Sequence, residues 1–307
     1  METANTKGEF IKLIFFGNYF YGICAVALTI EATLQQHYPL NDVFYFLAVF
    51  ASATLYYIKA YISESTTNTI NPRLIWYNTR RKTVIASRFI LNLILAVSIG
   101  SILYKYDISG ILTMTLSEWL IALIFPFVAI LYYGINSKSM RQYNLRNIGW
   151  LKPFVIAFTW AGLINVYPLL YYNITHKTTL NIDFLNILLF VKNFMFIAVL
   201  CIMFDIKDYA MDYNHKLKTF VVHVGLRKTI HNIIIPLTSL GIASFITFAI
   251  SMHFSIEKIM LNMIPFIAMI SVAYALHRRK SIFYYLIIID GLMLLKGICG
   301  TVAMVWF

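Results

Sequence analysis

Long apolar runs alternate with short polar segments along the whole chain. A helix rises about 1.5 Å per residue, so crossing the roughly 30 Å hydrocarbon core of a bilayer takes about 20 apolar residues. Nine runs approach or reach this length, although the fourth is short. The predicted spans are residues 10–32, 43–62, 84–103, 119–133, 154–172, 184–204, 230–251, 259–276 and 282–306. The pattern therefore predicts an all-α integral membrane protein of about nine transmembrane helices, with residues 1–307 as a single polytopic domain.

The composition agrees with this pattern. Hydrophobic residues make up 60% of the chain and charged residues only 12%, whereas about a quarter of the residues of a soluble domain are charged. The first run is too long for the apolar part of a signal peptide and lacks a cleavage site of small residues. We therefore expect it to be retained as a span.

Basic residues are concentrated in alternate connections. The connections after spans two, four, six and eight hold most of them, whereas the intervening ones hold few, chiefly Lys105, Lys177 and Lys258. By the positive-inside rule, the basic connections and the N-terminus are expected on the cytoplasmic side of the cell (inner) membrane, and the C-terminus outside. This placement accounts for the net charge of +12 without nucleic acid as a partner.

Three aspartates follow the sixth apolar run. Asp205, Asp208 and Asp212 are spaced three and then four positions apart, so a helix continuing through them carries all three carboxylates on one face. Like charges at this spacing repel, and a divalent cation would relieve the repulsion. Mg²⁺ prefers oxygen ligands, and one or two carboxylates with a substrate phosphate commonly hold it. The alternative is that the aspartates mark the polar end of a membrane helix.

This segment resembles a motif of a known family. The sequence DIKDYAMD at residues 205–212 is similar to the second aspartate-rich motif of the UbiA-type intramembrane prenyltransferases, which reads D-x-x-D-x-x-x-D. The resemblance continues downstream through Lys218, Thr219 and Gly225. Lys216 departs from it, because that family usually has glycine there.

The resemblance implies a fold and an activity. It implies a UbiA-like helical bundle whose central cavity opens to the cytoplasmic side and to lipid. It also implies that Asp205, Asp208 and Asp212 are catalytic and hold Mg²⁺ against the diphosphate of a polyprenyl donor. The isoprenyl group would pass to a lipophilic or aromatic acceptor, with membrane lipid around the tail. Metals and basic side chains are suited to stabilising a departing diphosphate.

The first aspartate motif of that family is degenerate here. Where the family has N-D-x-x-D-x-x-x-D, this chain has Lys59, Ala60, Ser63 and Thr67, with only Glu64 nearby. A protonated lysine cannot ligate a metal, but it binds phosphate as a point charge. One hypothesis is that Lys59 replaces the missing cation, and the alternative is that it only extends to the membrane interface.

Basic residues in the cytoplasmic connections are further candidates for diphosphate binding. The segment LRNIGWLKPF at residues 145–154 resembles the corresponding region of bacterial UbiA relatives. The candidate residues are Lys59, Arg73, Arg141, Arg146 and Lys218. Anchoring of the helix ends to anionic headgroups explains such residues equally well.

Several polar residues lie inside the predicted spans, where each is costly unless it has a partner or faces a cavity. Lys192 and Asn193 lie within the sixth span, and Asp290 and Lys296 within the ninth. We expect Asp290 to pair with Lys192 or Lys296. Glu31, near the outer end of the first span, is expected at the interface.

Three functions are compatible with these features. The first is Mg²⁺-dependent transfer of an isoprenyl group within the membrane. The second is a catalytically degenerate UbiA-like protein that binds lipid or a partner. The third is a transporter that uses Lys192, Asp290 and Lys296. The aspartates after the sixth span favour the first function, and the degenerate first motif favours the second.

Overall fold

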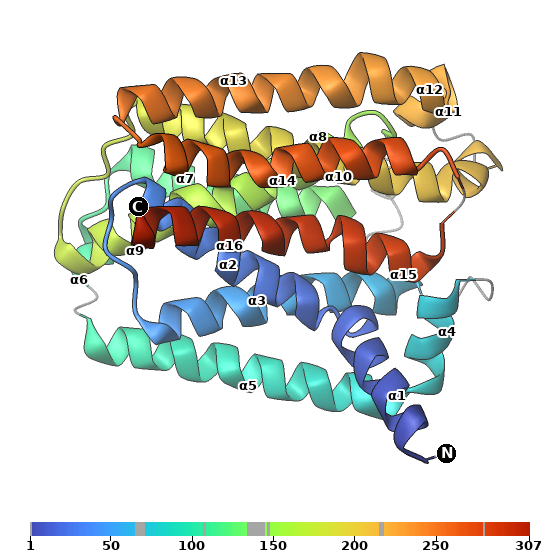
Figure 1. The fold of residues 1–307 in the computed structure, drawn as a ribbon. Helices are drawn as coiled ribbons and strands as arrows, with labels where there is room; N and C mark the ends of the chain where they lie inside the picture. Colours follow the sequence, from blue (N-terminus) through green and yellow to red (C-terminus); the bar gives the residue numbers. More distant parts are fainter. Residues whose placement is uncertain are drawn as a thin grey trace. The chain divides into compact units, whose positions relative to one another are not determined.

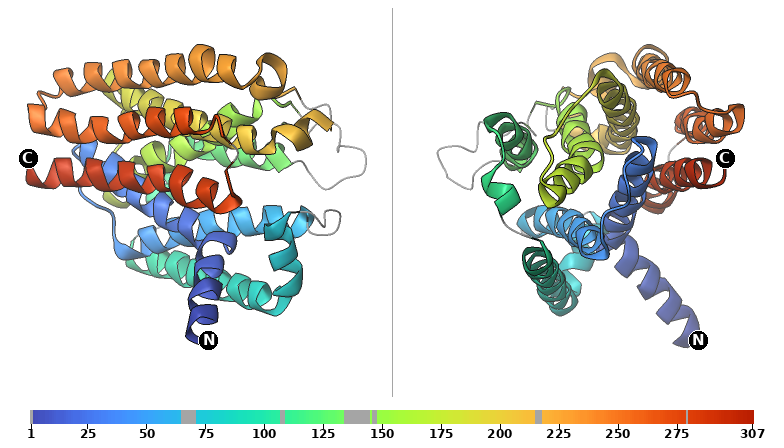
Figure 2. Two further views of the ribbon diagram at one scale, coloured as in Figure 1. Left: turned by 45° about the vertical axis from the view of Figure 1, so that its right-hand side comes forward. Right: turned by 90° about the vertical axis from the view of Figure 1, so that its left-hand side faces the viewer.

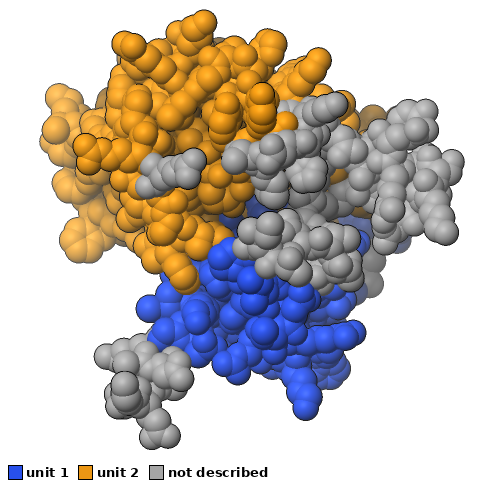
Figure 3. All heavy atoms as spheres, turned by 90° about the vertical axis from the view of Figure 1, so that its right-hand side faces the viewer, with its two compact units in different colours: residues 1–26, 41–112 blue, residues 27–40, 113–307 orange. Residues whose placement is uncertain are grey.

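The computed structural model describes residues 2–64, 71–106, 109–133, 145, 148–214, 218–278 and 280–307. Every regular element in these ranges is helical (Figure 1). The chain divides into two compact units (Figure 3). Unit 1 comprises Met1–Val26 and Asn41–Leu112, and unit 2 comprises Ala27–Leu40 and Thr113–Phe307. The boundary between them falls inside helix α2 (Tyr19–Gln35).

Unit 1 is built from short and long helices around α3. Its elements, apart from the first part of α2, are α1 (Glu2–Phe16), α3 (Val43–Glu64), α4 (Pro72–Thr79), α5 (Arg81–Lys105) and α6 (Ser109–Leu112). Helices α3 and α5 pack along each other, and α4 contacts α1, α3 and α5. Helix α4 begins at Pro72 after Asn71, whose side chain accepts a hydrogen bond from the Arg73 N–H. This is a typical helix start. The Asn71 side chain bonds a backbone N–H that has no partner within the helix, and Pro72 has no N–H that would need one.

The first predicted span is not one straight helix. Helices α1 and α2 are bent by 59° at a break between them. The break lies at Gly17 and Asn18, and Asn18 has a positive φ of 66°. Asparagine tolerates this left-handed conformation better than most residues, which ends one helix and starts the next. The predicted span over residues 10–32 is therefore interrupted by a bend at this point.

Unit 2 contains the longest helix and most of the remaining ones. In chain order its elements after α2 are α7 (Leu116–Tyr133), α8 (Lys152–Ala161), η3 (Gly162–Val166), α9 (Tyr167–His176), α10 (Phe184–Asn214), α11 (Phe220–Val224), α12 (Leu226–Thr229), η4 (Ile230–Ile234), α13 (Ile235–Ser251), α14 (Ile256–Ala275), α15 (Ile282–Tyr284), η5 (Tyr285–Ile289) and α16 (Gly291–Trp306). The elements named η are single π-helical turns. Pro168 follows η3 and Pro236 follows η4, and a proline without an N–H disturbs the regular hydrogen-bond ladder at such points.

Helix α10 is the centre of unit 2. It packs against α8 and α13, and α14 packs against α16 (Figures 1 and 2). Its inward face includes Phe196, Ile202 and Met203, all fully buried. The helix continues without a break to Asn214, so the condition under which the three aspartates share one helix is met. It carries Lys192 and Asn193 in its middle and the aspartates near its C-terminal end.

The helices fit an integral membrane protein. Among the described residues, six helical segments are long and apolar enough to cross a membrane. The bent pair α1 and α2 passes the same test only if its two helices are taken together, which makes up to seven. Two further predicted spans correspond to shorter apolar helices, Val43–Lys59 and Leu116–Tyr132. A membrane-spanning helical protein is therefore supported, and the number nine stays a prediction.

Close packing of α16 on α2 gives a testable contrast between two glycines. A Cβ atom added at Gly297 would lie 2.8 Å from the Cβ of Ala27 and 2.9 Å from its carbonyl carbon, whereas one at Gly291 would meet nothing within 4 Å. Small residues allow such close helix contacts in membranes. We expect Gly297→Ala to lower the free energy of unfolding by about 1–3 kcal/mol through overpacking. Gly291→Ala, the matched control, should raise it by about 0.5–1 kcal/mol.

Unfolding in mixed detergent micelles, followed by circular dichroism, measures both variants. Equal effects of the two substitutions would show that the contact between α16 and α2 does not limit stability.

Candidate functional site

The aspartates lie on the last turns of α10, and the structure places them in different surroundings. Asp205 is 1% exposed, and its Oδ1 accepts a hydrogen bond from Lys152 Nζ at 2.8 Å. Asp208 is about a quarter exposed at its side chain and pairs with the neighbouring Lys207 at 3.3 Å. Asp212 lies on the same helix, but its side chain is outside the described part of the structure.

The Lys152 partner was not predicted from the sequence. Lys152 is the first residue of α8, followed by Pro153, and α8 packs directly against α10. The ammonium group therefore enters from a neighbouring helix and meets a carboxylate that is almost fully buried. Removing either member would leave a charge without compensation, which is costly in a low-dielectric interior. The sequence did contain one signal for this partner. Lys152 stands directly before Pro153, which starts a helix at the end of a predicted span.

The second oxygen of Asp205 remains without a partner. Oδ2 is buried and has no hydrogen-bond partner among the described residues. A buried carboxylate oxygen in this condition usually binds a water molecule or an ion. Asp208 lies one helical turn away on the same face. One or two carboxylates completed by water and phosphate oxygens are a common set for Mg²⁺, so these residues fit such an ion. In the described part of the chain, no group of three His, Cys, Asp or Glu side chains forms a metal site by itself.

Two segments that carry the family resemblance lie against each other. A Cβ atom added at Gly149 would lie 2.7 Å from the carbonyl carbon of Lys218 and 2.8 Å from the backbone nitrogen of Thr219. The turn before α8 therefore touches the start of α11, and only a glycine allows this approach. The Lys218 side chain is exposed.

The other predicted diphosphate-binding residues have different outcomes. Lys59 is exposed on α3 in unit 1. Arg141 and Arg146 lie outside the described residues, as do Thr67 and the side chains of Ala60, Ser63 and Glu64. For these residues the predictions stand as they were made.

Arg73 has a structural environment that the sequence did not suggest. It is 2% exposed, and its guanidinium donates to the carbonyl oxygens of Phe15 and Phe16 at 2.9 and 3.3 Å. It also donates to the Tyr61 hydroxyl at 2.9 Å and to the Asn18 side chain. Arg73 thus binds the carbonyls at the end of α1, at the break before α2, and is not presented at a surface. Carbonyl groups at a helix end lack helical partners, and a guanidinium satisfies several at once.

Tyr77 completes this network from α4. Its hydroxyl accepts a hydrogen bond from Asn18 Nδ2 at 2.7 Å. Burial raises the pKa of the Tyr77 phenol above its usual range, so the group stays neutral. Both polar atoms of the Asn18 side chain are therefore bonded, which accounts for a fully buried asparagine at the break.

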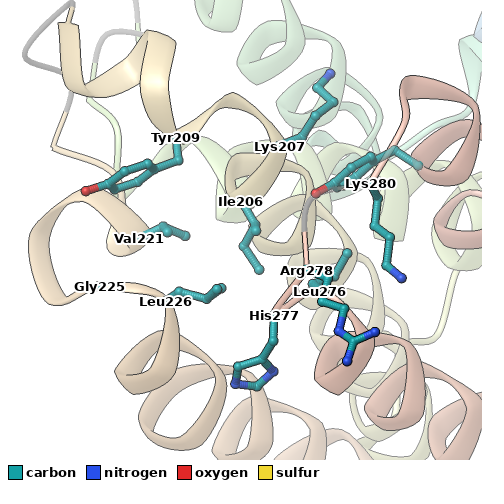
Figure 4. Close-up of a pocket in the computed structure, with 11 residues that line it drawn as sticks. Ile206, Lys207, Tyr209, Val221, Gly225, Leu226, Leu276, His277, Arg278 and Lys280 are labelled. Atoms are coloured by element: carbon teal, nitrogen blue, oxygen red, sulfur yellow. The ribbon is translucent and has the colours of Figure 1, made fainter.

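A cavity of about 590 Å³ lies next to the aspartate segment in unit 2 (Figure 4). Residues of α10, α11, α12, η5 and the connection from α14 to α15 line it. Of the lining residues within the described part of the chain, Lys207, Arg278 and Lys280 are cationic and none is acidic. The sequence had marked Arg278 and Lys280 only as part of a basic connection.

A buried ion cluster crosses the middle of unit 2. Lys192 Nζ donates to Glu31 Oε1 at 2.9 Å and to Gln35 Oε1 at 2.6 Å. Lys296 Nζ donates to the other carboxylate oxygen of Glu31. Gln35 in turn donates to Asn262 Oδ1 at 2.8 Å. One carboxylate on α2 thus joins ammonium groups on α10 and α16, and we call Glu31, Lys192 and Lys296 the buried triad.

The buried triad corrects one expectation and leaves another as a prediction. Glu31 is fully buried, so its predicted interfacial position is wrong. Both lysines bind Glu31, a partner that the sequence did not suggest, and the pairing of Asp290 with one of them stays a prediction. Glu31 lies on α2, far away in sequence, so helical spacing could not reveal the contact. Asp290 itself is buried at the start of α16.

A second polar network involves residues next to the triad in sequence, Gln36 and Asn193. Asn193 Nδ2 donates to Asn165 Oδ1 at 2.7 Å, and Asn186 Nδ2 donates to Gln36 Oε1 at 3.0 Å. Gln36 also donates to the Asn165 carbonyl at 3.3 Å. Asn165 lies in the π turn η3, and a small cavity of about 140 Å³ borders Gln36, Asn165 and Asn186. Asn193 inside its span therefore has an amide partner for Nδ2, whereas its buried Oδ1 has none among the described residues.

Part of the predicted site is brought together within unit 2. Asp205, Asp208 and Lys218 belong to elements at one end of α10 and α11, together with Lys152, which was missed. Lys192, Asn193 and Lys296 belong instead to the buried networks further along α10 and α16. In comparisons with models of known families, with curated proteins and with solved structures, no match to this chain is found.

Proposed function

We propose that the protein is an integral membrane prenyltransferase, which transfers an isoprenyl group from a polyprenyl diphosphate to a lipophilic or aromatic acceptor. The observation that carries the proposal is the buried Asp205 carboxylate, with one oxygen on Lys152 and the other without a hydrogen-bond partner among the residues that the structure describes. The resemblance of residues 205–212 to an aspartate motif supports the same conclusion. By the positive-inside rule, we expect this site at the cytoplasmic face.

Asp205 and Asp208 would hold the metal in this proposal, with Asp212 as a third ligand. When bound, Mg²⁺ supplies electrostatic stabilisation to the diphosphate as it leaves. Lys152 would orient Asp205 through its hydrogen bond to Oδ1, and Lys218 would meet phosphate oxygens as a point charge. The apolar faces of the surrounding helices would hold the polyprenyl tail and keep water from the allylic carbon.

Release of diphosphate tests the proposal. Membranes containing the full chain would be incubated with labelled polyprenyl diphosphates of several lengths, aromatic or lipophilic acceptors and Mg²⁺. We expect metal-dependent release, and we expect Asp208→Asn to lower it about tenfold or more, since a tenfold change corresponds to roughly 1.4 kcal/mol. Asp183→Asn is the matched control, because it removes an exposed carboxylate just before the first turn of α10. Equal release from both variants would rule out a role for Asp208.

A second candidate function has one observation in its favour. Lys152 already compensates the charge of Asp205, and the first aspartate motif is degenerate, so the protein could bind a lipid diphosphate without turnover. Binding of the labelled donor with no release, at any tail length, would support this candidate over the transferase. The ion pairs of Lys192 and Lys296 with Glu31 favour a structural role for these lysines over transport.

A further inference from the structure

The cavity beside α10 combines features that the proposed reaction does not use. Its lining residues come from α10, α11, α12, the α14–α15 connection and η5. They are Ile206, Lys207, Tyr209, Val221, Gly225, Leu226, Leu276, His277, Arg278, Lys280 and Tyr285. A volume of about 590 Å³ is within the range of ligand pockets in proteins, roughly 300–1,000 Å³. The cavity is therefore large enough for a charged headgroup and the first part of a hydrocarbon chain.

One side of the cavity is cationic. Arg278 and Lys280 lie in the connection between α14 and α15, and Figure 4 shows Arg278 and His277 together at this side. Lys280 lies over the Tyr284 ring, with its Nζ 4.9 Å from the ring centre. Lys207, on the α10 side, pairs with Asp208 and extends away from His277. Among the described residues, Arg278 and Lys280 are thus the cations available to an anion in the cavity. A guanidinium group is particularly suited to binding phosphate oxygens.

The remainder of the lining is mostly apolar. Val221 and Leu226 point toward Ile206 across the cavity, and Leu276 borders it from α14 (Figure 4). A soluble anion gains nothing from such a lining, whereas a molecule with a phosphate head and a hydrocarbon chain matches both parts. Basic pockets between membrane helices on the cytoplasmic side are a known setting for anionic headgroups.

We propose that this cavity binds a phosphate-bearing headgroup through Arg278 and Lys280, with the attached hydrocarbon chain against Ile206, Val221 and Leu226. The inference is independent of prenyl transfer, because neither residue belongs to the aspartate site. The phosphate has two possible sources, an anionic membrane lipid or a free diphosphate. The apolar lining favours the lipid.

Binding in two arms tests the proposal and separates the sources. In the first arm, the full chain would be reconstituted in nanodiscs of phosphatidylcholine and phosphatidylglycerol, and native mass spectrometry would count the retained phosphatidylglycerol. In the second, radiolabelled inorganic diphosphate would be titrated into phosphatidylcholine nanodiscs. The variant is R278Q/K280Q. The matched control is R227Q/K228Q, because both residues are exposed on α12, outside the cavity lining, and the loss of charge is the same.

We expect R278Q/K280Q to weaken phosphatidylglycerol retention about tenfold or more, since two charge-assisted hydrogen-bonding groups are lost. R227Q/K228Q should change it less than about twofold, because exposed charges contribute little. A selective loss in the diphosphate arm alone would support the phosphate site and identify a free anion as its ligand. Equal loss in both double variants, or no binding above the phosphatidylcholine background in either arm, would overturn the proposal. Thermal unfolding of each variant confirms that it is folded.

Discussion

Glu31→Gln is expected to lower the free energy of unfolding by about 3–5 kcal/mol, the usual cost of removing one partner from a buried ion pair. The carboxylate of Glu31 is the shared acceptor of Lys192 and Lys296, and all three side chains are almost fully buried. A glutamine keeps the shape but leaves two ammonium groups facing each other without an anion. Aromatic rings lie 5.3 Å from Lys192 and 5.7 Å from Lys296, but such contacts contribute only about 0.5–2 kcal/mol each.

Equilibrium unfolding in mixed micelles measures this effect, with Glu257→Gln as the matched control. Glu257 is exposed in the first turn of α14, so its loss should change stability by less than about 1 kcal/mol. The triple variant Glu31→Gln, Lys192→Met and Lys296→Met should recover at least half of the loss, because apolar residues can replace a buried ion cluster. A change within about 1 kcal/mol for Glu31→Gln alone would show that the buried triad does not hold α2, α10 and α16 together.

Arg73→Lys is expected to destabilise unit 1 by about 2–4 kcal/mol, since hydrogen bonds of charged groups contribute roughly 1.5–3 kcal/mol each and do not add fully. The guanidinium bonds two carbonyls at the end of α1 and the side chains of Asn18 and Tyr61. Its centre also lies 4.1 Å from the centre of the Tyr61 ring. A lysine side chain has a single nitrogen, so it cannot donate to all the acceptors that the planar guanidinium reaches with its three nitrogens.

Arg80→Lys is the matched control for this prediction. Arg80 pairs with Glu9 at 2.7 Å, but its side chain is about half exposed, so its replacement should cost less than about 1 kcal/mol. Thermal unfolding in detergent, followed by tryptophan fluorescence, suits this comparison because Trp76 is buried on α4. If the two lysine variants unfold at the same temperature, the network around Asn18 does not stabilise the break between α1 and α2.

Local patterns in the sequence were sufficient for the helices and for part of the site. Apolar runs predicted the positions of the long helices. The spacing of Asp205, Asp208 and Asp212 suited one face of a helix, and all three residues do lie on α10. These features depend only on neighbours within a few residues, and helical periodicity reports on them directly.

Contacts between distant segments could not be predicted in this way. Lys152 on Asp205, Glu31 on both lysines and Arg73 on the end of α1 each join residues more than 50 positions apart. A polar residue inside a span signals that a partner exists, but it does not say which helix provides it. The cavity at Arg278 and Lys280 is a similar case, since it arises where two basic connections come together around α10.

The sequence by itself determined the class of this protein, because a membrane span is set by the length and polarity of one segment and needs no partner to be recognised. It also determined which residues are chemically unusual, namely the aspartates of α10 and the charged residues inside spans. Only the tertiary structure decided which partners those residues contact. It assigned Glu31 to two lysines, Lys152 to Asp205 and Arg73 to a helix break, because desolvation forces each buried charge to the partner that packing brings within reach.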